Sequence, residues 1–464
     1  MEIDKLMYEP EYVFEKLTDN QKDEMEKLCG EYRAFLDAGK TERECVSAAV
    51  AMAEKAGFVS FDSASELNAG DKIYIVNRKK NILLAVIGKS PLTEGISLVG
   101  AHVDSPRLDL KQNPLYESSN MSLLKTHYYG GIKKYQWTAM PLALHGVMFT
   151  SEGKQVDISI GEDEDDPVFC VTDLLPHLAK DQMSKKLSEA IEGEALNILF
   201  GGFTIDASEK KDKFKKNILS LMYKKYGVSE KNFLSAELEA VPAFKAKNVG
   251  LDGAFVGAYG QDDRVCAFTS LKAILDVDMP DKTSVCLLVD KEEIGSCGNT
   301  GMLSDFFRFA LAEIAEKQLG SCDYLTLSRI LKNSSCLSSD VGAAVDPNYE
   351  GVTEKQNAAY AGCGMVLMKY TGARGKSGSS DASAEFVYRI GKILDDNGVF
   401  WQTSELGKVD QGGGGTIAQY VANLNMDVID CGVPVLSMHS PFEVTAKTDI
   451  YMAYLSYVAF YKCN

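Results

Sequence analysis

The sequence predicts an α/β fold, in which a mixed, largely parallel sheet is flanked by helices and interrupted by an inserted β-rich segment. Two observations lead to this prediction. Short β-rich runs alternate with longer helical patterns toward both ends of the chain. From about Leu110 to Gly250 that alternation stops. Because 464 residues suffice for two domains, we expect one domain at 1–109 with 251–464 and an inserted domain at 110–250.

The first hundred residues are expected to form helices and then strands. Between Glu11 and Ala56, charged residues separate apolar positions at spacings of three and four, which is typical of helices. Three β-rich runs bounded by turn residues then predict strands at Lys72–Asn77, Ile82–Ile87 and Ile96–Val99.

The middle segment is interpreted as an insertion into this core. Val156–Ile160 alternates like a half-exposed strand. An acidic run, Glu162–Asp166, and a basic run, Lys210–Lys216, are interpreted as solvated loops or helix faces.

After Gly250 the alternation of strands and helices returns. Ser284–Val289 is a continuous apolar run, as in a strand buried on both faces. The other expected elements are helices at 265–277, 301–317, 380–393, 416–424 and 443–460, and a strand at 428–438.

Composition and charge exclude several classes of protein. A net charge of −17 repels phosphate backbones, so we expect no nucleic-acid partner. No run of eighteen apolar residues occurs, and the polar N-terminus lacks the features of a signal peptide, so we expect a cytoplasmic protein without a membrane partner. Eleven dispersed cysteines without a C-x-x-C pair favour free thiols. The glycines at 412–415 lack the Gly-Lys-Ser/Thr ending of a nucleotide-binding loop.

Two histidines and several carboxylates lie at the ends of the expected strands. His102 and Asp104 come after Ile96–Val99, and their i, i+2 spacing puts both side chains on one face of an extended chain. Asp104 is therefore expected to orient the imidazole of His102 or a nearby ligand. The other candidates are Asp262 and Asp263 in YGQDDRV, Glu292 and Glu293 in VDKEEIGS, Asp340 in SSDVGAAVDP, and His439 in LSMHSPFE.

These residue types together suit Zn²⁺, Mn²⁺ or Co²⁺. Two metal ions would share one bridging carboxylate, and a further carboxylate must stay off the metals to deprotonate the attacking water. The adjacent glutamates fit that division of roles. Each motif by itself also has a plainer explanation, such as a hydrogen-bonded core pair or a helix cap. The hypothesis therefore depends on their shared placement at strand ends.

At these residues the sequence resembles the aspartyl aminopeptidase family of dinuclear metallopeptidases, in its bacterial branch. The matching stretches occur in the family's order from about Ile96 to Glu443. They are AHVDSPRLDLK, YYGGIKKYQW, LLPHLA, GQDDRVCAF, DKEEIGSCG, SSDVGAAVDPNYE, GGGGTIAQY and MHSPFE.

The resemblance implies two zinc or similar divalent ions and hydrolysis of the N-terminal residue from peptide substrates. Glu292 resembles the family's general base, and Asp104 the residue that orients a histidine ligand. The implied metal ligands are His102, Asp262 as the bridging carboxylate, Glu293, Asp340 and His439.

The resemblance also implies two substrate contacts and an assembly. His177 in LLPHLA is similar to a histidine that reaches a neighbouring subunit's active site, and Lys369 in GMVLMKY to a lysine that meets an acidic substrate side chain. The next stretch, TGARGKSGSSDAS, lacks the Gln-Arg-Tyr motif of eukaryotic members, so Arg374 and Lys376 are alternative basic contacts. In the family, the inserted domain builds dimers, which assemble into a dodecamer.

Two other functions remain as alternatives. The same metal scaffold could serve a carboxypeptidase or an N-deacylase, which place the basic group for a substrate carboxylate differently. A non-catalytic assembly protein with a vestigial metal site would lack at least one ligand, whereas all the expected ligand types are present here.

Overall fold

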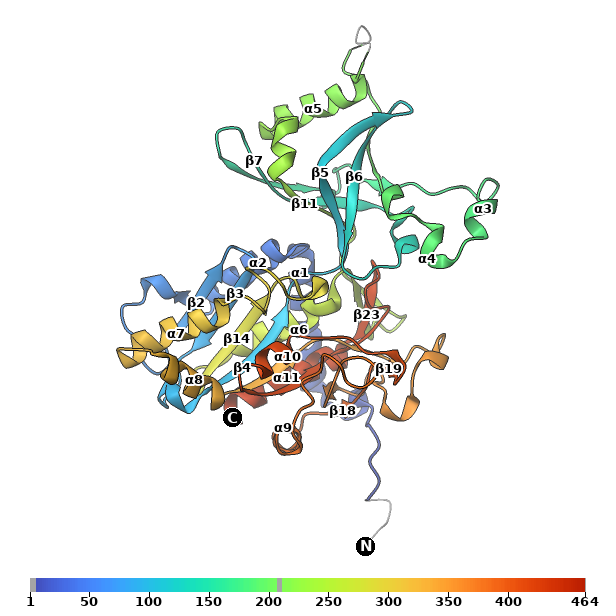
Figure 1. The fold of residues 1–464 in the computed structure, drawn as a ribbon. Coiled ribbons are helices and arrows are strands. Elements are labelled where there is room, and N and C mark those ends of the chain that lie inside the picture. Colours follow the sequence, from blue (N-terminus) through green and yellow to red (C-terminus); the bar gives the residue numbers. More distant parts are fainter. Residues whose placement is uncertain (1–5, 207–210, 464) are drawn as a thin grey trace. The chain divides into compact units, whose positions relative to one another are not determined.

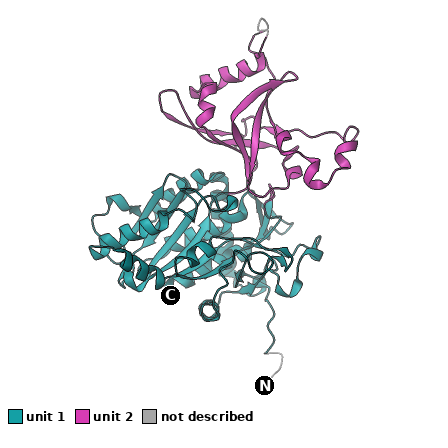
Figure 2. Ribbon diagram, in the orientation of Figure 1, with its two compact units in different colours: residues 1–104, 246–438, 443–464 teal, residues 105–245, 439–442 magenta. Residues whose placement is uncertain are grey.

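The structure, a computed structural model, describes residues 6–206 and 211–463. It divides into two compact units (Figure 2). Unit 1 comprises residues 1–104, 246–438 and 443–464, and unit 2 comprises residues 105–245 and 439–442. Among the described residues, no helix combines the length and the apolar character that a membrane span requires.

Unit 1 is built on a nine-stranded mixed sheet (Figure 1). Its strands, in spatial order, are β1 (Val59–Ser60), β2 (Lys72–Asn77), β3 (Asn81–Val86), β14 (Thr283–Val289), β4 (Ile96–His102), β15 (Ser335–Ser339), β21 (Asp427–Gly432), β17 (Met365–Met368) and β18 (Trp401–Thr403). The central four, from β14 to β21, are parallel, and β3 and β17 run antiparallel on either side of them. The predicted α/β class with a mixed, largely parallel sheet is confirmed.

Helices cover both faces of this sheet because the central strands are apolar on both sides. Every residue of β4 and β14 is buried. Alternate residues of β3 enter two separate apolar clusters: Leu84 joins one and Leu83 the other. The first cluster contains residues of α1 (Asp19–Ala38), α2 (Glu42–Lys55), α6 (Gln261–Leu275), α9 (Ala384–Asp396) and α11 (Lys447–Cys463). The second contains residues of α7 (Phe306–Leu319), α8 (Tyr324–Lys332) and α10 (Ala418–Ala422).

The expected helices after Gly250 occur with shifted bounds, and two helix predictions differ from the structure in more than their bounds. The helical region expected at 11–56 is divided between α1 and α2, each of which begins at a threonine capping box, Thr18 and Thr41. The helix expected at 443–460 begins only at Lys447, because Glu443–Ala446 forms β23. That strand pairs with β13 (Phe255–Ala258), which is distant in sequence, so local periodicity did not reveal it.

Unit 1 also contains a smaller five-stranded sheet. Its order is β12 (Lys247–Val249), β13, β23, β22 (Pro434–Leu436) and β16 (Gly342–Ala343). The single strand expected at 428–438 is thus two strands, β21 and β22, separated at Val433. Each of the two belongs to a different sheet.

Unit 2 contains a seven-stranded antiparallel sheet, which agrees with the β-rich character expected of the middle segment. The order is β8 (Gln155–Ile160), β7 (Leu142–Phe149), β11 (Glu237–Pro242), β5 (Arg107–Ser118), β6 (Met121–Tyr129), β10 (Ile198–Gly201) and β9 (Cys170–Val171). The acidic run at 162–166 lies in turns. The basic run continues into α5 (Lys213–Tyr226), and its first residue, Lys210, lies outside the described residues.

Candidate metal centre

Three parallel strands of unit 1 end at one edge of the sheet and deliver polar side chains there. In the register of β14 with β4, Val289 lies opposite His102, the last residue of β4. Glu292 and Glu293 follow Val289 in the short 3-10 helix η8 (Glu292–Ile294). Asp340 follows β15, the other neighbour of β4. Because the carboxyl ends of parallel strands meet at one edge, residues far apart in sequence converge at this place.

The start of α6 adds two more carboxylates. Asp262 and Asp263 are buried, have non-helical backbone angles and are joined by a cis peptide bond. Glu443, at the start of β23, fixes this turn: its Oε2 accepts a hydrogen bond from the Asp262 N–H at 3.1 Å, and its carbonyl oxygen accepts one from Gln261 Nε2 at 2.6 Å.

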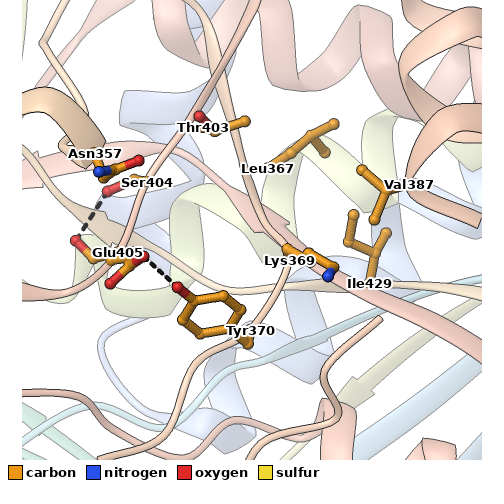
Figure 3. Close-up of a pocket in the computed structure, with 9 residues that line it drawn as sticks. All are labelled: Asn357, Leu367, Lys369, Tyr370, Val387, Thr403, Ser404, Glu405 and Ile429. Carbon is orange, nitrogen blue, oxygen red and sulfur yellow. Dashed lines mark hydrogen bonds between the residues drawn. The ribbon is translucent and has the colours of Figure 1, made fainter. Parts of the chain in front are cut away.

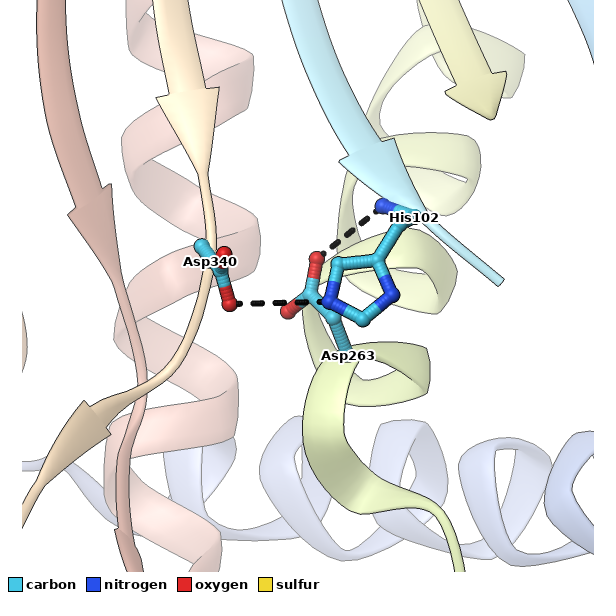
Figure 4. Close-up of side chains that lie close together, drawn as sticks. All are labelled: His102, Asp263 and Asp340. Atoms are coloured by element: carbon cyan, nitrogen blue, oxygen red, sulfur yellow. Dashed lines mark hydrogen bonds and ion pairs between the residues drawn. The ribbon is translucent and has the colours of Figure 1, made fainter. Parts of the chain in front are cut away.

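The imidazole of His102 lies at the centre of these carboxylates. Its Nε2 is 3.3 Å from Asp262 Oδ1, 3.8 Å from Asp340 Oδ1 and 3.9 Å from Glu292 Oε2. Two groups of three residues each offer possible metal-ligand atoms that lie within 4.8 Å of one another. The first group is His102, Asp263 and Asp340 (Figure 4), and the second is His102, Asp262 and Glu293. His102 therefore belongs to both sets.

Asp104 connects the histidine to the glutamate pair. Its Oδ1 lies 3.2 Å from His102 Nδ1, and its two carboxylate oxygens accept hydrogen bonds from the backbone N–H groups of Glu292 and Glu293, at 3.1 and 3.2 Å. The carboxylate is fully buried, so these contacts are shielded from water. The Asp104 carboxylate thus contacts the His102 ring, as the i, i+2 spacing predicts, and also the backbone of the two glutamates.

The cluster carries an excess of like charge. Burial and the neighbouring Asp340 raise the pKa of Asp263 well above its ordinary value, and burial raises the pKa of Asp340 as well. Burial raises the pKa of Glu292 to about 8, and the carboxylates of Asp340, Asp104 and Asp262 contribute to that rise. Burial alone would lower the pKa of His102, but Asp104, Asp262 and Asp340 raise it well above its usual range.

The residues of this cluster fit divalent zinc. Nε2 of His102 and Oδ1 of Asp263 are buried without a hydrogen bond among the described residues. Buried polar atoms without hydrogen bonds are unfavourable, and so are several carboxylates around one imidazole. A divalent cation would satisfy both demands, and nitrogen and carboxylate oxygen are ligands that zinc accepts.

The other candidate histidines lie in unit 2. His439 is part of the short segment 439–442, and its Nδ1 is 2.8 Å from the carbonyl oxygen of Gly131. His177 is exposed and precedes α3 (Lys180–Met183). The exposed apolar side chains of Leu174, Leu175 and Leu178 surround it in sequence. The roles expected for both histidines remain predictions.

Lys369 lies beside a pocket of about 210 Å³ in unit 1 (Figure 3). Apolar side chains of Leu367, Val387 and Ile429 line the part of the pocket next to Lys369, and Glu405 lies on the other side, where it accepts a hydrogen bond from Tyr370 Oη. The other lining residues are Asn357, Thr403 and Ser404.

The sheet register separates this pocket from the carboxylate cluster. Ser339, which precedes Asp340, pairs with Cys431 of β21, whereas Met368, which precedes Lys369, pairs with Asp430 of the same strand. Because β17 is antiparallel to β21, Lys369 continues toward Ile429 while Asp340 continues toward Gly432. Ile429 and Gly432 are three residues apart on β21, which corresponds to about 10 Å along the strand direction.

Two buried acids acquire importance only in the structure. Asp263 was recognised in the sequence as part of an Asp-Asp pair, but received no role of its own. Its Oδ2 accepts the His102 backbone N–H at 3.2 Å. Glu443 ends the MHSPFE motif, and the signal that could have identified it is an acidic residue next to an apolar strand.

Comparisons with known proteins agree with this chemistry. Residues 35–461 match the family described as aminopeptidase I zinc metalloprotease (M18). A probable M18 family aminopeptidase 1 of Clostridium acetobutylicum is 50% identical over 459 residues, 98% of each chain. The crystal structure of an M18 family aminopeptidase from Thermotoga maritima superposes with a TM-score of 0.95 at 44% identity, covering 98% of this chain and 100% of that one.

A more distant structure, the S. cerevisiae mApe1 dodecamer, shares the fold at 21% identity, with a TM-score of 0.74, covering 93% of this chain and 95% of that one. The family indicated by the sequence motifs is thereby confirmed.

Proposed function

Because the chain belongs to the M18 family of zinc aminopeptidases, we propose that it removes N-terminal residues from peptides with two zinc ions and a glutamate base. The observation that carries this proposal is the convergence of His102 with carboxylates from three strand ends and from the start of α6. Mn²⁺ and Co²⁺ suit the same ligands, so zinc follows from the family rather than from the ligand set.

In this proposal the two ions share Asp262, and the other ligands are His102, Glu293, Asp340 and His439. The two ligand sets around His102 support the first four of these residues. Asp104 acts through its neighbours, because it contacts the ring of His102 and the backbone of both glutamates. When bound, the ions would polarise the scissile carbonyl and lower the pKa of the attacking water.

Glu292 is the proposed general base. It takes a proton from the water at its carboxylate and gives that proton to the leaving amine. Its side chain is 16% exposed, compared with 5% for Asp262 and 11% for Asp340, so it is the most accessible of these three carboxylates. This accessibility supports Glu292 as the carboxylate that faces the water. Glu293 is half-buried like Glu292, and its proposed role as a ligand is supported by its place in the set with His102 and Asp262.

Substrate selection is assigned to the negative charge of the cluster and to one position outside it, Lys369. Surplus negative charge near the cluster would attract the free α-amine of a peptide, which accounts for the restriction to N-termini. Lys369 is proposed to meet an acidic side chain of the substrate, and the pocket beside it supplies room for that group. Apolar walls from Leu367, Val387 and Ile429 would shield one side of the charge pair from water, although Lys369 itself is exposed.

Unit 2 is proposed as an inserted dimerisation and lid domain of a homo-oligomer. The exposed side chains of Leu174, Leu175 and Leu178 support an interface there, because contiguous exposed apolar residues usually contact a partner. His177, which lies between them, would then reach a neighbouring subunit. A dodecamer is the assembly of the distant yeast relative and is the proposed end point here.

The proposal is tested by hydrolysis of chromogenic substrates with N-terminal Asp, Glu, Leu, Lys and Ala, before and after chelation and zinc add-back. Chelator-sensitive release of the N-terminal residue is expected. Cleavage of N-acylated or C-terminal substrates instead would favour the deacylase or carboxypeptidase alternative. No cleavage of any substrate by zinc-loaded protein would favour the non-catalytic assembly protein.

A further inference from the structure

The loop that carries Glu292 and Glu293 is closed by three side chains from its two ends. Lys291 Nζ donates to Thr300 Oγ1 at 2.6 Å, and Thr300 Oγ1 donates to Asp290 Oδ2 at 2.6 Å. Lys291 Nζ also lies 3.4 Å from Asp290 Oδ2. We call these three residues the loop lock. Asp290 and Thr300, ten positions apart in sequence, are thus held together at the two ends of the loop that carries the glutamate pair.

The loop lock is shielded from water. The Asp290 side chain is 2% exposed, that of Lys291 26%, and Thr300 is buried. A charge-assisted hydrogen bond in such surroundings is stronger than a surface ion pair. A backbone hydrogen bond from the Asp290 N–H to the Thr300 carbonyl, at 3.2 Å, adds to the closure.

The β2–β3 hairpin fixes the loop lock to the sheet. Asn81 Nδ2, fully buried on β3, donates to the Thr300 carbonyl at 2.8 Å, and Asn77 Nδ2 on β2 donates to the Asn299 carbonyl at 3.0 Å. Asp104 accepts the backbone N–H groups of the two glutamates. The loop is therefore fixed both at its end, near Thr300, and at the two glutamates.

The backbone of this loop is unfavourable without such contacts. Lys291 has φ +67°, in the left-handed region that residues with a side chain rarely adopt. Gly301 packs so tightly that a Cβ there would lie 2.1 Å from the Ser296 carbonyl oxygen. The Ser296 N–H in turn donates to the Lys291 carbonyl at 2.7 Å. The direction in which the chain leaves Lys291 determines where the next two side chains point.

We propose that Lys291 and Thr300 are positioning residues for the active centre, acting through the loop lock to set the orientation of Glu292 and Glu293. This inference rests on the proposed function. Lys291 and Thr300 act on the two glutamates through the backbone of the loop, and not by contact with the substrate. A merely structural role would lower stability alone, whereas a positioning role must also affect turnover and zinc affinity.

The matched substitutions are Thr300→Val, which removes only the hydroxyl, and Thr300→Ser, which keeps it. Thr300→Val is expected to lower kcat by about 10-fold to 100-fold, with KM changed less than about 3-fold. Zinc affinity, measured by competition with a chelating dye, is expected to fall about 10-fold because Glu293 is a proposed ligand. Thr300→Ser should restore most of both quantities.

Thr269→Val is the control for loss of a buried hydroxyl. Thr269 is fully buried in α6, and its hydroxyl donates to the Val265 carbonyl of the same helix at 2.7 Å. It should lower the melting temperature without changing kcat or zinc affinity. Lys291→Met, which keeps the apolar stem of a partly exposed side chain, is the second variant and should reproduce the effects of Thr300→Val.

The inference is overturned if Thr300→Val and Lys291→Met keep wild-type kcat and zinc affinity, or change them no more than Thr269→Val at a similar loss of melting temperature. Failure of the proposed function has a different signature, because the zinc-loaded wild-type protein would then cleave no aminoacyl substrate. The zinc-affinity comparison still tests the loop lock in that case.

Discussion

The cluster around His102 and the pocket beside Lys369 lie in the same unit but differ in what they offer a ligand. The cluster is buried and crowded with carboxylates, some with raised pKa values, and its contacts come from several elements. In the pocket, the cation Lys369 is exposed, and much of the wall is apolar. This difference agrees with the proposed division, in which the charged cluster holds the metal ions and the exposed cation beside an apolar wall selects the substrate.

The difference also extends to how the two regions are fixed. The cluster is formed by residues on or next to strands that are buried on both faces, β4, β14 and β15. Beyond Lys369 the chain continues into a glycine-rich loop, which is bridged to the glycines at 412–415 by the Gly372 N–H and the Gly414 carbonyl. The cluster is therefore supported mainly by buried strands, whereas the region beyond Lys369 is supported by contacts between two glycine-rich loops.

The largest effect is expected at the proposed base, and it tests the chemical side of the comparison. Glu292→Gln removes proton transfer but keeps size and polarity, so kcat should fall by about 10³-fold to 10⁴-fold. Zinc content, measured by elemental analysis, should remain that of the wild type. Retained activity would contradict the assignment of the base, and loss of zinc would mean that Glu292 is a ligand.

A somewhat smaller effect is expected for the shared ligand. Asp262→Asn should weaken both zinc sites together by more than about 100-fold, because removal of a ligand costs more than removal of its supporting partner. Isothermal titration of the zinc-free protein measures both sites. Glu443→Gln is the matched control, since it alters the acceptor of the Asp262 N–H without removing a ligand. Weakening of only one site would argue against a shared carboxylate.

Asp430 lies between the cluster and the pocket, and its titration tests whether burial and the charge of Asp340 raise its pKa. This carboxylate is buried, and its pKa is raised to about 7 by burial first and by Asp340 second, although Thr416 and Ser380 hydrogen-bond to it. A folded-state pKa above the unfolded value means that the folded protein binds more protons between pH 4 and pH 7, so stability falls as pH rises through this window.

Relative to Asp430→Asn, the zinc-free wild-type protein should therefore lose about 2 kcal/mol of unfolding free energy between pH 5 and pH 7. Urea unfolding at a series of pH values measures the difference. A constant difference between the two proteins across this range would show that Asp430 titrates normally in the fold.

The smallest effect is expected in the pocket, and it tests the selective side of the comparison. Lys369→Met should lower kcat/KM for N-terminal Asp and Glu by about 10-fold and leave Leu unchanged, because one partly solvated charge pair is lost. Lys376→Met is the informative comparison, since Lys376 lies over the Tyr370 ring at 3.8 Å but pairs with Asp381. A larger effect at Lys376 would transfer the selective role to it.

The class of fold, several helices and strands, and the chain positions of the chemical groups could all be predicted from local patterns in the sequence. The strands β2 and β14 were predicted to within a residue, because apolar runs bounded by turn residues are local signals. The motifs around His102, Asp262, Glu292 and Asp340 were also visible locally, and their placement after apolar strands was enough to expect that they would converge.

Only the tertiary structure decided which of these groups touch and what supports them. Glu443 begins a strand instead of a helix because it pairs with β13. The same pairing places its carboxylate where it accepts a hydrogen bond from the Asp262 N–H. Asp104 contacts the glutamate backbone only because β4 and β14 are neighbours. The offset of Lys369 from Asp340 follows from the antiparallel direction of β17. Each depends on pairing between distant segments, and such pairing leaves no periodic signal in the chain.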